Sequence, residues 1–449
     1  MGNSHKLNAI PAAVLLLLLS ACGDSDTPEP ESTTEDSPEA VAVEAPPPNP
    51  YEGAAVFSGA NLWDGTAAAI QQDAVLVVRD GRIAEVLPGP APEGASVTDL
   101  SGLWIVPGFI DAHAHVSGYW AADGVQDIEQ RLRDELSLYA RYGVTTVNSL
   151  GGEPAEAFKI RDAQNDSSLA HARLYVAGDV VADTDPLAAA KTATTNIMSG
   201  VDWVKIRVDD NLGTAQKMPW PAVEAVFDAA NARGARVATH VFYREDAFRL
   251  LELGTDLIAH SIRDKPLDDP FVARLLSSGV CYVPTLTREV STFVYATRPD
   301  FFDDPFFQKA AKQSEVERVS SPQFMAQVAR SPLAAGYRKA LTQAQDNLRI
   351  VIGSGVPVAF GTDAGPPGRF PGYFEHLEFQ LMRDAGLTPL EILQSATSVA
   401  AGCLGLSDVG SLTVGKWADF VVLGKNPLED ILATRSIQSV YVAGNRVAE

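Results

Sequence analysis

The middle of the chain, from about residue 104 to 400, alternates short apolar runs with longer stretches of helical periodicity. Successive runs begin about 20 to 40 residues apart until the seventh, a spacing typical of parallel strands joined by crossover helices. The eight runs are WIVPGFIDAHAHV, VTTVNSL, RLYVAGD, DWVKIRV, RVATHVF, DLIAHSI, VCYVPTL and VPVAFGTD. Eight such units predict an α/β fold of the (β/α)8, TIM-like barrel class. A helical insertion at about 290–350 precedes the eighth run and is placed to cover the barrel mouth.

The two ends of the chain have a different pattern, rich in β-branched residues and tight turns. Asp80-Gly81 lies between apolar runs in VLVVRDGRIAEVL, and Ala443-Gly444-Asn445 forms a similar turn near the C-terminus. Both are hairpin signals. We therefore expect a small β-sandwich domain built from residues 51–103 and 405–449, flanking a barrel over 104–404.

The first 50 residues are typical of a secreted, tethered protein. Residues 1–21 contain Lys6 and the apolar run AAVLLLLLS, which has the form of a signal peptide and is too short for a membrane span. The run ends in LSAC, which resembles the lipobox of bacterial lipoproteins and predicts lipid on Cys22. The alternative is a plain signal peptide with an incidental cysteine. Residues 22–50 are acidic and proline-rich and predict a disordered tether.

These features predict a location in the bacterial cell envelope. Gly23, rather than an aspartate, follows Cys22, which favours the outer membrane, with the protein facing the periplasm. A net charge of −22 without a basic stripe excludes nucleic acid as a partner, and the oligomeric state stays open. Cys281 and Cys403 could pair outside the cytoplasm, but two thiols in a large core are more often simply buried.

Candidate metal ligands follow several of the predicted strands. Alternation along the first run sends Asp111, His113 and His115 to one face, so both imidazoles could reach one ion. Further strand ends carry His240, His260 and Asp363. Taken singly, each histidine could be an ordinary buried side chain. Because the carboxyl ends of barrel strands meet at one mouth, the joint pattern favours a metal centre of imidazole and carboxylate ligands.

Lys205 in the fourth run shares a face with Trp203 and Arg207. An inward lysine is energetically costly unless it is neutralised or paired. The alternative to a functional role is a structural ion pair with Asp209 or Asp210.

Together, VPGFIDAHAHV, FGTDAG, GSLTVGKWADFVVL and the split β domain resemble the amidohydrolase superfamily over essentially all of residues 51–449, closest to its imidazolonepropionase-like and prolidase-like branch. The resemblance implies that Lys205 is carboxylated and bridges two divalent metal ions, most readily zinc. It also implies that His113, His115 and Asp363 bind the more buried ion. His240 and His260 would bind the second, and Asp363 would be the catalytic acid and base.

The resemblance implies a lipid-anchored, binuclear metal-dependent amidohydrolase that cleaves a small amide, such as a dipeptide or an N-acyl amino acid, through a metal-bridging hydroxide. Tyr243 and Arg263 closely follow metal-binding histidines and are candidates for the substrate carboxylate, with loop packing as the alternative. His376 has no assigned role. Two other hypotheses remain open: a mononuclear cyclic-amide hydrolase or deaminase of the same superfamily, and a non-catalytic lipid-anchored binding protein.

Overall fold

The structure is a computed structural model that describes residues 49–448. The predicted signal peptide, Cys22 and nearly all of the predicted tether lie outside the described residues. Within residues 49–448, no helix combines the length and apolar character needed to span a membrane.

The two ends of the described chain meet in one eight-stranded sheet. Its order is β15-β14-β13-β5-β1-β2-β3, with β4 also paired to β1. The strands are β1 (Ala55–Trp63), β2 (Ile70–Arg79), β3 (Arg82–Pro88), β4 (Val97–Asp99), β5 (Trp104–Pro107), β13 (Phe420–Leu423), β14 (Ile437–Val442) and β15 (Asn445–Arg446). Phe57, Phe420 and Tyr441 pack together in its core, with ring centroids 4.5 to 5.0 Å apart. Both termini contribute, as expected, but the ladders form a single sheet, so the predicted two-sheet sandwich is not confirmed.

The first predicted barrel strand is divided at Gly108. Its first part is β5, which pairs with β13 of the large sheet, and its second part is β6 (Phe109–Ala114). A side chain at Gly108 would collide with Thr145, so the close approach of the two segments requires glycine here. The chain thus passes from the large sheet directly into the segment that carries His113.

Seven of the eight predicted parallel strands are present, in two parallel sheets. One has the order β6-β7-β8 and the other β12-β11-β10-β9. Their strands are β7 (Val144–Ser149), β8 (Arg173–Tyr175), β9 (Val204–Val208), β10 (Val237–Val241), β11 (Leu257–Ala259) and β12 (Cys281–Val283). Single bridges join Val181 to Ile206 and Tyr282 to Val358.

The eighth predicted strand is not regular, and the described ladders do not form a closed barrel. Pro357 has no amide hydrogen to donate, and Asp363 has a left-handed backbone with φ of 60°. The segment still connects the two sheets, because the Ala112 amide donates to Phe360 and the Ala359 amide donates to Tyr282. The fold is therefore mixed α/β, and closure of the predicted TIM-like barrel is not confirmed in residues 49–448.

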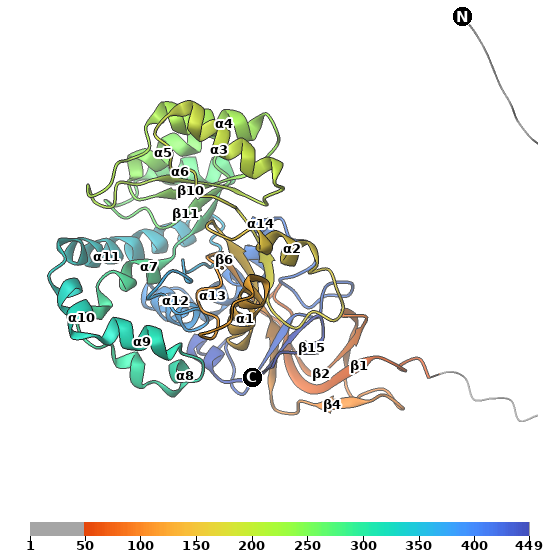
Figure 1. Cartoon of the computed structure of the whole chain (residues 1–449). Helices are drawn as coiled ribbons and strands as arrows, with labels where there is room; N and C mark the ends of the chain where they lie inside the picture. The colour runs from red at the N-terminus through yellow and green to blue at the C-terminus, as the bar shows by residue number, and fades with distance from the viewer. Residues whose placement is uncertain (1–48, 449) are drawn as a thin grey trace, which may run out of the picture. The chain divides into compact units, whose positions relative to one another are not determined.

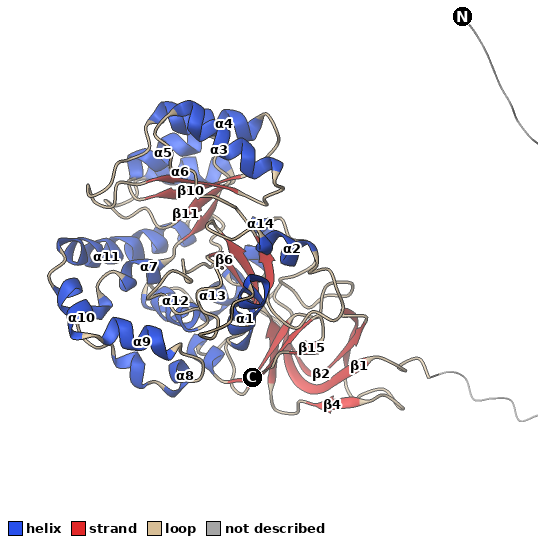
Figure 2. Ribbon diagram, in the orientation of Figure 1, coloured by secondary structure: helices blue, strands red, loops and turns tan. Residues whose placement is uncertain are grey.

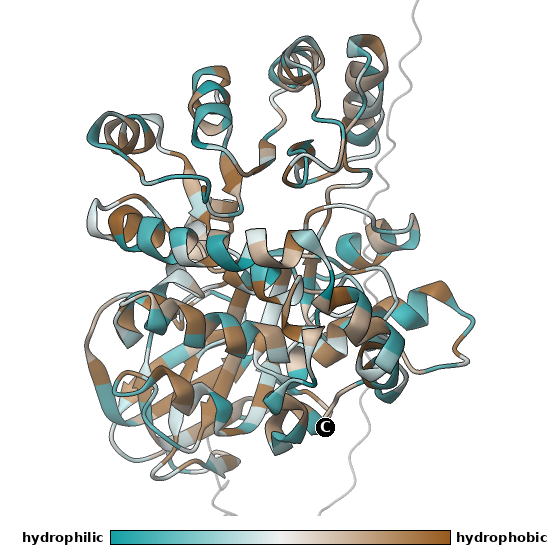
Figure 3. Ribbon diagram, turned by 90° about the vertical axis from the view of Figure 1, so that its left-hand side faces the viewer, coloured by the Kyte–Doolittle hydropathy of each residue, from teal (hydrophilic) through white to brown (hydrophobic). Residues whose placement is uncertain are grey.

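Helices pack against these sheets and contribute many of the buried apolar side chains. Figure 1 shows α3 to α6 beside β10 and β11, and Figure 2 shows the predominantly helical region from α7 to α11. In Figure 3 the helices carry both polar and apolar residues along their length. The helices are α1 (Ile128–Arg141), α2 (Glu156–Asp162), α3 (Pro186–Met198), α4 (Trp220–Asn231), α5 (Arg244–Leu253), α6 (Asp269–Ser278), α7 (Leu286–Ser291), α8 (Pro305–Gln308), α9 (Gln313–Ser320), α10 (Pro322–Ala329), α11 (Pro332–Gly353), α12 (Tyr373–Asp384), α13 (Pro389–Ser395) and α14 (Ser398–Leu404), with 3-10 turns η1 (Val294–Ala296), η2 (Asp300–Asp303) and η3 (Ile431–Arg435).

Cys281 and Cys403 form a disulfide, which the sequence analysis did not predict. The bond joins the start of β12 to α14 across a sequence separation of 122 residues, with the two Cα atoms 5.8 Å apart. Pairing depended on bringing these distant segments together, which their spacing in the sequence does not reveal.

His376 lies on a buried face of α12 and not in the candidate site. Its Nε2 lies 2.8 Å from the carbonyl oxygen of Tyr142, and its Nδ1 lies 3.2 Å from the hydroxyl of Thr434. These contacts connect α12 to the end of α1 and to η3. His376 therefore has a structural role in the described chain.

Candidate metal centre

The six predicted ligands line one cavity of about 440 Å³. They come from five different segments: His113 and His115 from β6 and the residues after it, Lys205 from β9, His240 from β10, His260 from the end of β11, and Asp363 from the irregular segment after Val358. All of them except His115 and His240 are buried, and those two are half-buried. The structure thus brings together every residue that the sequence analysis assigned to the metals.

Asp363 is at the centre of the first group of ligands. Its Oδ1 lies 2.8 Å from His115 Nε2 and 3.6 Å from His113 Nε2. Ligand atoms of His113, His260 and Asp363 all lie within 4.8 Å of one another. This spacing allows several donors to reach one ion.

His240 and His260 form the second group. His260 Nε2 lies 2.8 Å from His240 Nδ1, so these two nitrogens face the same point. Their other nitrogens are occupied, since His240 Nε2 lies 2.8 Å from Asp209 Oδ2 and His260 Nδ1 lies 2.7 Å from Thr285 Oγ1. Partners of this kind orient an imidazole and fix which nitrogen is left for a metal.

His115 is oriented in the same way. Its Nδ1 lies 2.7 Å from the carbonyl oxygen of Gly151, which leaves Nε2 directed at Asp363. The sequence analysis missed Asp209, Thr285 and Gly151 as orienting groups. Of these three, only Asp209 could have been found from the sequence, because its spacing of two residues from Arg207 places it on the same strand face as Lys205 and Arg207.

Lys205 is not in the structural ion pair that was its alternative. Asp209 contacts His240, and Asp210 accepts a hydrogen bond from the Tyr243 hydroxyl at 2.8 Å. The Lys205 Nζ instead lies 3.1 Å from His113 Nε2. Burial lowers the pKa of Lys205 to about 7, so a large fraction of its amine is uncharged near neutral pH.

The electrostatics of the cavity favour metal-binding forms of the side chains. Burial lowers the pKa of His240 to about 3 and holds the pKa values of His113 and His260 well below the usual range. Burial opposes ionisation of Asp363, but Arg369 and His115 outweigh it and hold the pKa of that carboxyl well below its ordinary value. Neutral imidazoles and an ionised carboxylate are ligands suited to zinc and similar divalent ions, so the donor set fits a metal centre.

The backbone is strained at two of the ligands. His260 has φ of 105° and Asp363 has φ of 60°. Positive φ is uncommon for residues other than glycine and concentrates where a side chain must be held in a particular direction.

Tyr243 and Arg263, the predicted substrate-binding residues, do not line this cavity. The Arg263 guanidinium is buried, donates to the Val241 carbonyl at 2.9 Å and forms an ion pair with Glu289 at 2.9 Å. The cavity is lined instead by three other arginines, which the sequence analysis did not assign: Arg207, Arg288 and Arg369. Arg288 and Arg369 follow the seventh and eighth apolar runs, the only sequence signal for them.

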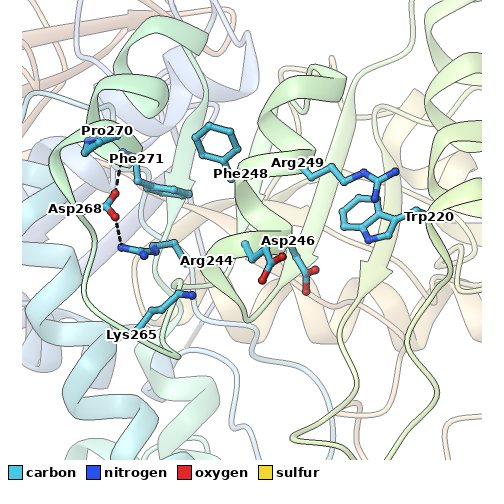
Figure 4. Close-up of a pocket in the computed structure, with 10 residues that line it drawn as sticks. Trp220, Arg244, Asp246, Phe248, Arg249, Lys265, Asp268, Pro270 and Phe271 are labelled. Carbon is cyan, nitrogen blue, oxygen red and sulfur yellow. Dashed lines mark hydrogen bonds and ion pairs between the residues drawn. The ribbon is translucent and has the colours of Figure 1, made fainter.

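A second cavity of about 490 Å³ lies among α4, α5 and α6 (Figure 4). Trp220, Phe248 and Phe271 line it, together with an ion pair between Arg244 and Asp268. It contains none of the predicted ligands. Asp246 and Arg249, which also line it, pair with Lys217 and Glu224 outside the cavity. The chemistry of the described chain is therefore concentrated at the first cavity.

Known proteins resemble this chain over most of its length. The sequence model described as "Amidohydrolase family" matches residues 104–447. Imidazolonepropionase from Deinococcus radiodurans is 28% identical over 433 residues, which covers 89% of this chain and 96% of the relative. A solved Xaa-Pro dipeptidase with bound methionine in its active site superposes with a TM-score of 0.68 at 24% identity, covering 88% of this chain and all of that one. Phenylurea hydrolase B superposes with a TM-score of 0.64 at 24% identity, covering 88% of this chain and 96% of that one. These structural likenesses concern the fold.

Proposed function

The chain belongs to the amidohydrolase family, and from that premise we propose that it is a binuclear metal-dependent hydrolase of a small amide. Membership makes it a hydrolase acting on carbon–nitrogen bonds. The observation that carries the proposal is the convergence of four histidines, Asp363 and Lys205 on one cavity. Lys205 Nζ lies beside His113, where a carboxylated lysine would offer one oxygen to each of two ions.

Each group in the cavity has a role in this proposal. Two divalent ions, of which zinc suits the ligands best, would supply Lewis acidity and lower the pKa of a bound water towards ~7. Asp363 accepts the proton of the attacking water and delivers it to the leaving amine nitrogen. His115 would bind a metal ion through Nε2, the nitrogen that its contact with the Gly151 carbonyl leaves available. Asp209 orients His240 towards His260.

The substrate class proposed is a dipeptide or an N-acyl amino acid. The cavity volume of about 440 Å³ accommodates a molecule of this size. The similarity to a Xaa-Pro dipeptidase supports the same class. A screen of metal-loaded protein against dipeptides, N-acyl amino acids, lactones and cyclic ureas would identify the bond that is cleaved. If only cyclic ureas were hydrolysed, the proposed substrate class would be wrong and a cyclic amide would take its place.

A second candidate function is a mononuclear cyclic-amide hydrolase or deaminase of the same family. It is favoured by the close group of His113, His260 and Asp363, which could hold one ion without Lys205. The number of ions in the active protein separates the two candidates.

The metal content is the first test. Elemental analysis of active protein is expected to give close to two divalent ions per chain, and His113→Ala should lower both metal content and activity, because it removes a buried ligand. His171→Ala is the matched control, since this histidine contacts Arg133 and a backbone carbonyl away from the cavity. One tightly bound ion in fully active protein would support the mononuclear candidate, and active protein without metal would exclude both.

We further propose that the protein is held at the periplasmic face of the outer membrane by lipid on Cys22. The disulfide between Cys281 and Cys403 supports export, because such bonds persist in oxidising compartments.

The anchor is tested by Cys22→Ser. Without its thiol the chain has no attachment site for lipid, so most of the protein should move from the membrane fraction to the soluble fraction. Immunoblots of fractionated cells measure this, with Ser25→Ala in the same stretch as the control. Unchanged membrane retention of Cys22→Ser would contradict the anchor.

A further inference from the structure

Arg207 lies on the same strand face as Lys205 and next to a metal-binding histidine. It is in β9, two residues after Lys205, so both side chains point to the same side of the sheet. In the parallel ladder between β9 and β10, Arg207 is paired with His240. Both Arg207 and His240 line the cavity. The guanidinium is thus positioned beside the second group of ligands, about 6 to 7 Å along the strand from Lys205.

The Arg207 guanidinium is half-buried and is not neutralised by any group in the described part of the chain. Within residues 49–448, the Arg207 side chain has neither a hydrogen bond nor an ion pair, and its Nε is buried without a partner. A hydrogen-bond donor shut off from water, as Nε is, is costly unless an acceptor satisfies it.

The other two arginines of the cavity differ in this respect. Arg288 forms an ion pair with Glu289 at 3.2 Å, although its Nε, like that of Arg207, is buried without a partner among the described residues. Arg369 contacts the carboxylate of Asp363 and donates from Nε to Ser291 Oγ at 3.0 Å. Arg207 is therefore the arginine of the described cavity that has its donors free for a ligand.

We infer that Arg207 binds a carboxylate of the substrate, and that the enzyme is selective for small amides with a free carboxylate over their neutral analogues. This inference rests on the proposed function. A guanidinium presents two parallel N–H donors that match the two oxygens of a carboxylate. The apolar side chains of Leu150, Val180 and Ala182 line the same cavity and accommodate a short aliphatic group between the carboxylate and the bond to be cleaved.

The probe is a pair of compounds that differ in one charge. N-methylphosphonyl-alanine places a tetrahedral phosphonate at the metals and retains the free carboxylate, whereas N-methylphosphonyl-alaninol has a neutral hydroxymethyl group instead. Their affinities for zinc-loaded protein are measured by calorimetry in the parent, in Arg207→Met, in Arg207→Lys and in Arg249→Met. The last variant is the matched control, because Arg249 pairs with Glu224 outside this cavity.

The parent and Arg249→Met are expected to bind the acid about 30-fold or more tightly than the alcohol, since two charge-assisted hydrogen bonds are involved. Arg207→Met should bind both compounds nearly equally, and Arg207→Lys should retain part of the preference. Metal content should be unchanged in Arg207→Met. Equal binding of the two compounds by the parent, or an unaltered preference in Arg207→Met, would overturn the inference and leave the proposed function intact.

Two remaining outcomes are also informative. Loss of metal from Arg207→Met would indicate that the guanidinium stabilises the carboxylated Lys205 and does not bind the substrate. That result would overturn the inference. Failure of the metal-loaded parent to bind either phosphonate would count against the proposed function, and the inference would fail with it.

Discussion

Lys205→Ala is expected to lose one of two metal ions and to lower turnover by about a thousandfold or more, a scale set by the several kcal/mol that a catalytic metal contributes. The physical reason is charge. Lys205 is buried among histidines and Asp363, and an ammonium there would be poorly solvated and repelled by two cations. Carboxylation would convert it into an anion with an oxygen for each ion.

The rescue experiment separates a bridging role from a general structural one. In Lys205→Ala, added acetate or propionate should restore part of the activity, because a small carboxylate can occupy the vacated space and supply the same two oxygens. Lys205→Arg should stay inactive in the presence of either acid. Metal content and turnover are measured together, with the exposed Lys191→Ala as the control.

Near-normal metal content and turnover in Lys205→Ala would exclude the carboxylated bridge. The mononuclear candidate would then be preferred, since the group of His113, His260 and Asp363 does not include the lysine.

Removing the disulfide is expected to lower the free energy of unfolding by about 4 kcal/mol. The bond closes a separation of 122 residues, for which the chain-entropy model gives ~5 kcal/mol, while measured disulfides usually contribute ~2 to 4 kcal/mol. Cys281→Ser/Cys403→Ser should therefore unfold at a clearly lower urea concentration than the oxidised parent. The midpoint of urea unfolding, followed by circular dichroism, measures the difference.

Reduction provides the control for this prediction. A reducing agent should shift the parent towards the midpoint of the double variant and should leave the double variant unchanged. Equal midpoints for the oxidised parent and the double variant would show that the bond does not stabilise the fold. The same comparison on protein made in a reducing and in an oxidising compartment would show whether stability depends on export.

The sequence alone predicted the α/β alternation and the residues of the candidate metal centre. Strand periodicity is a local property, because it depends on side chains two residues apart, and seven of the eight predicted parallel strands are present. The carboxyl ends of parallel strands lie on the same side of the sheet. A histidine, lysine or aspartate at such an end can therefore be predicted to join a common site. His113, His240 and Asp363 were found in this way and share a cavity in the structure.

Contacts between segments far apart in the sequence were decided only by the tertiary structure. Local pattern marked Arg263 as a substrate residue, but its guanidinium is buried against Glu289 and the backbone, and Arg207 lines the cavity instead. The Cys281–Cys403 bond, the single terminal sheet and the irregular segment around Pro357 likewise depend on which segments are brought together. A residue's type and spacing fix what it can bind. Tertiary packing decides which of the possible partners it contacts, because a buried polar group is stable only when it is paired. A charge such as that of Arg207 stays unpaired only where a ligand can enter.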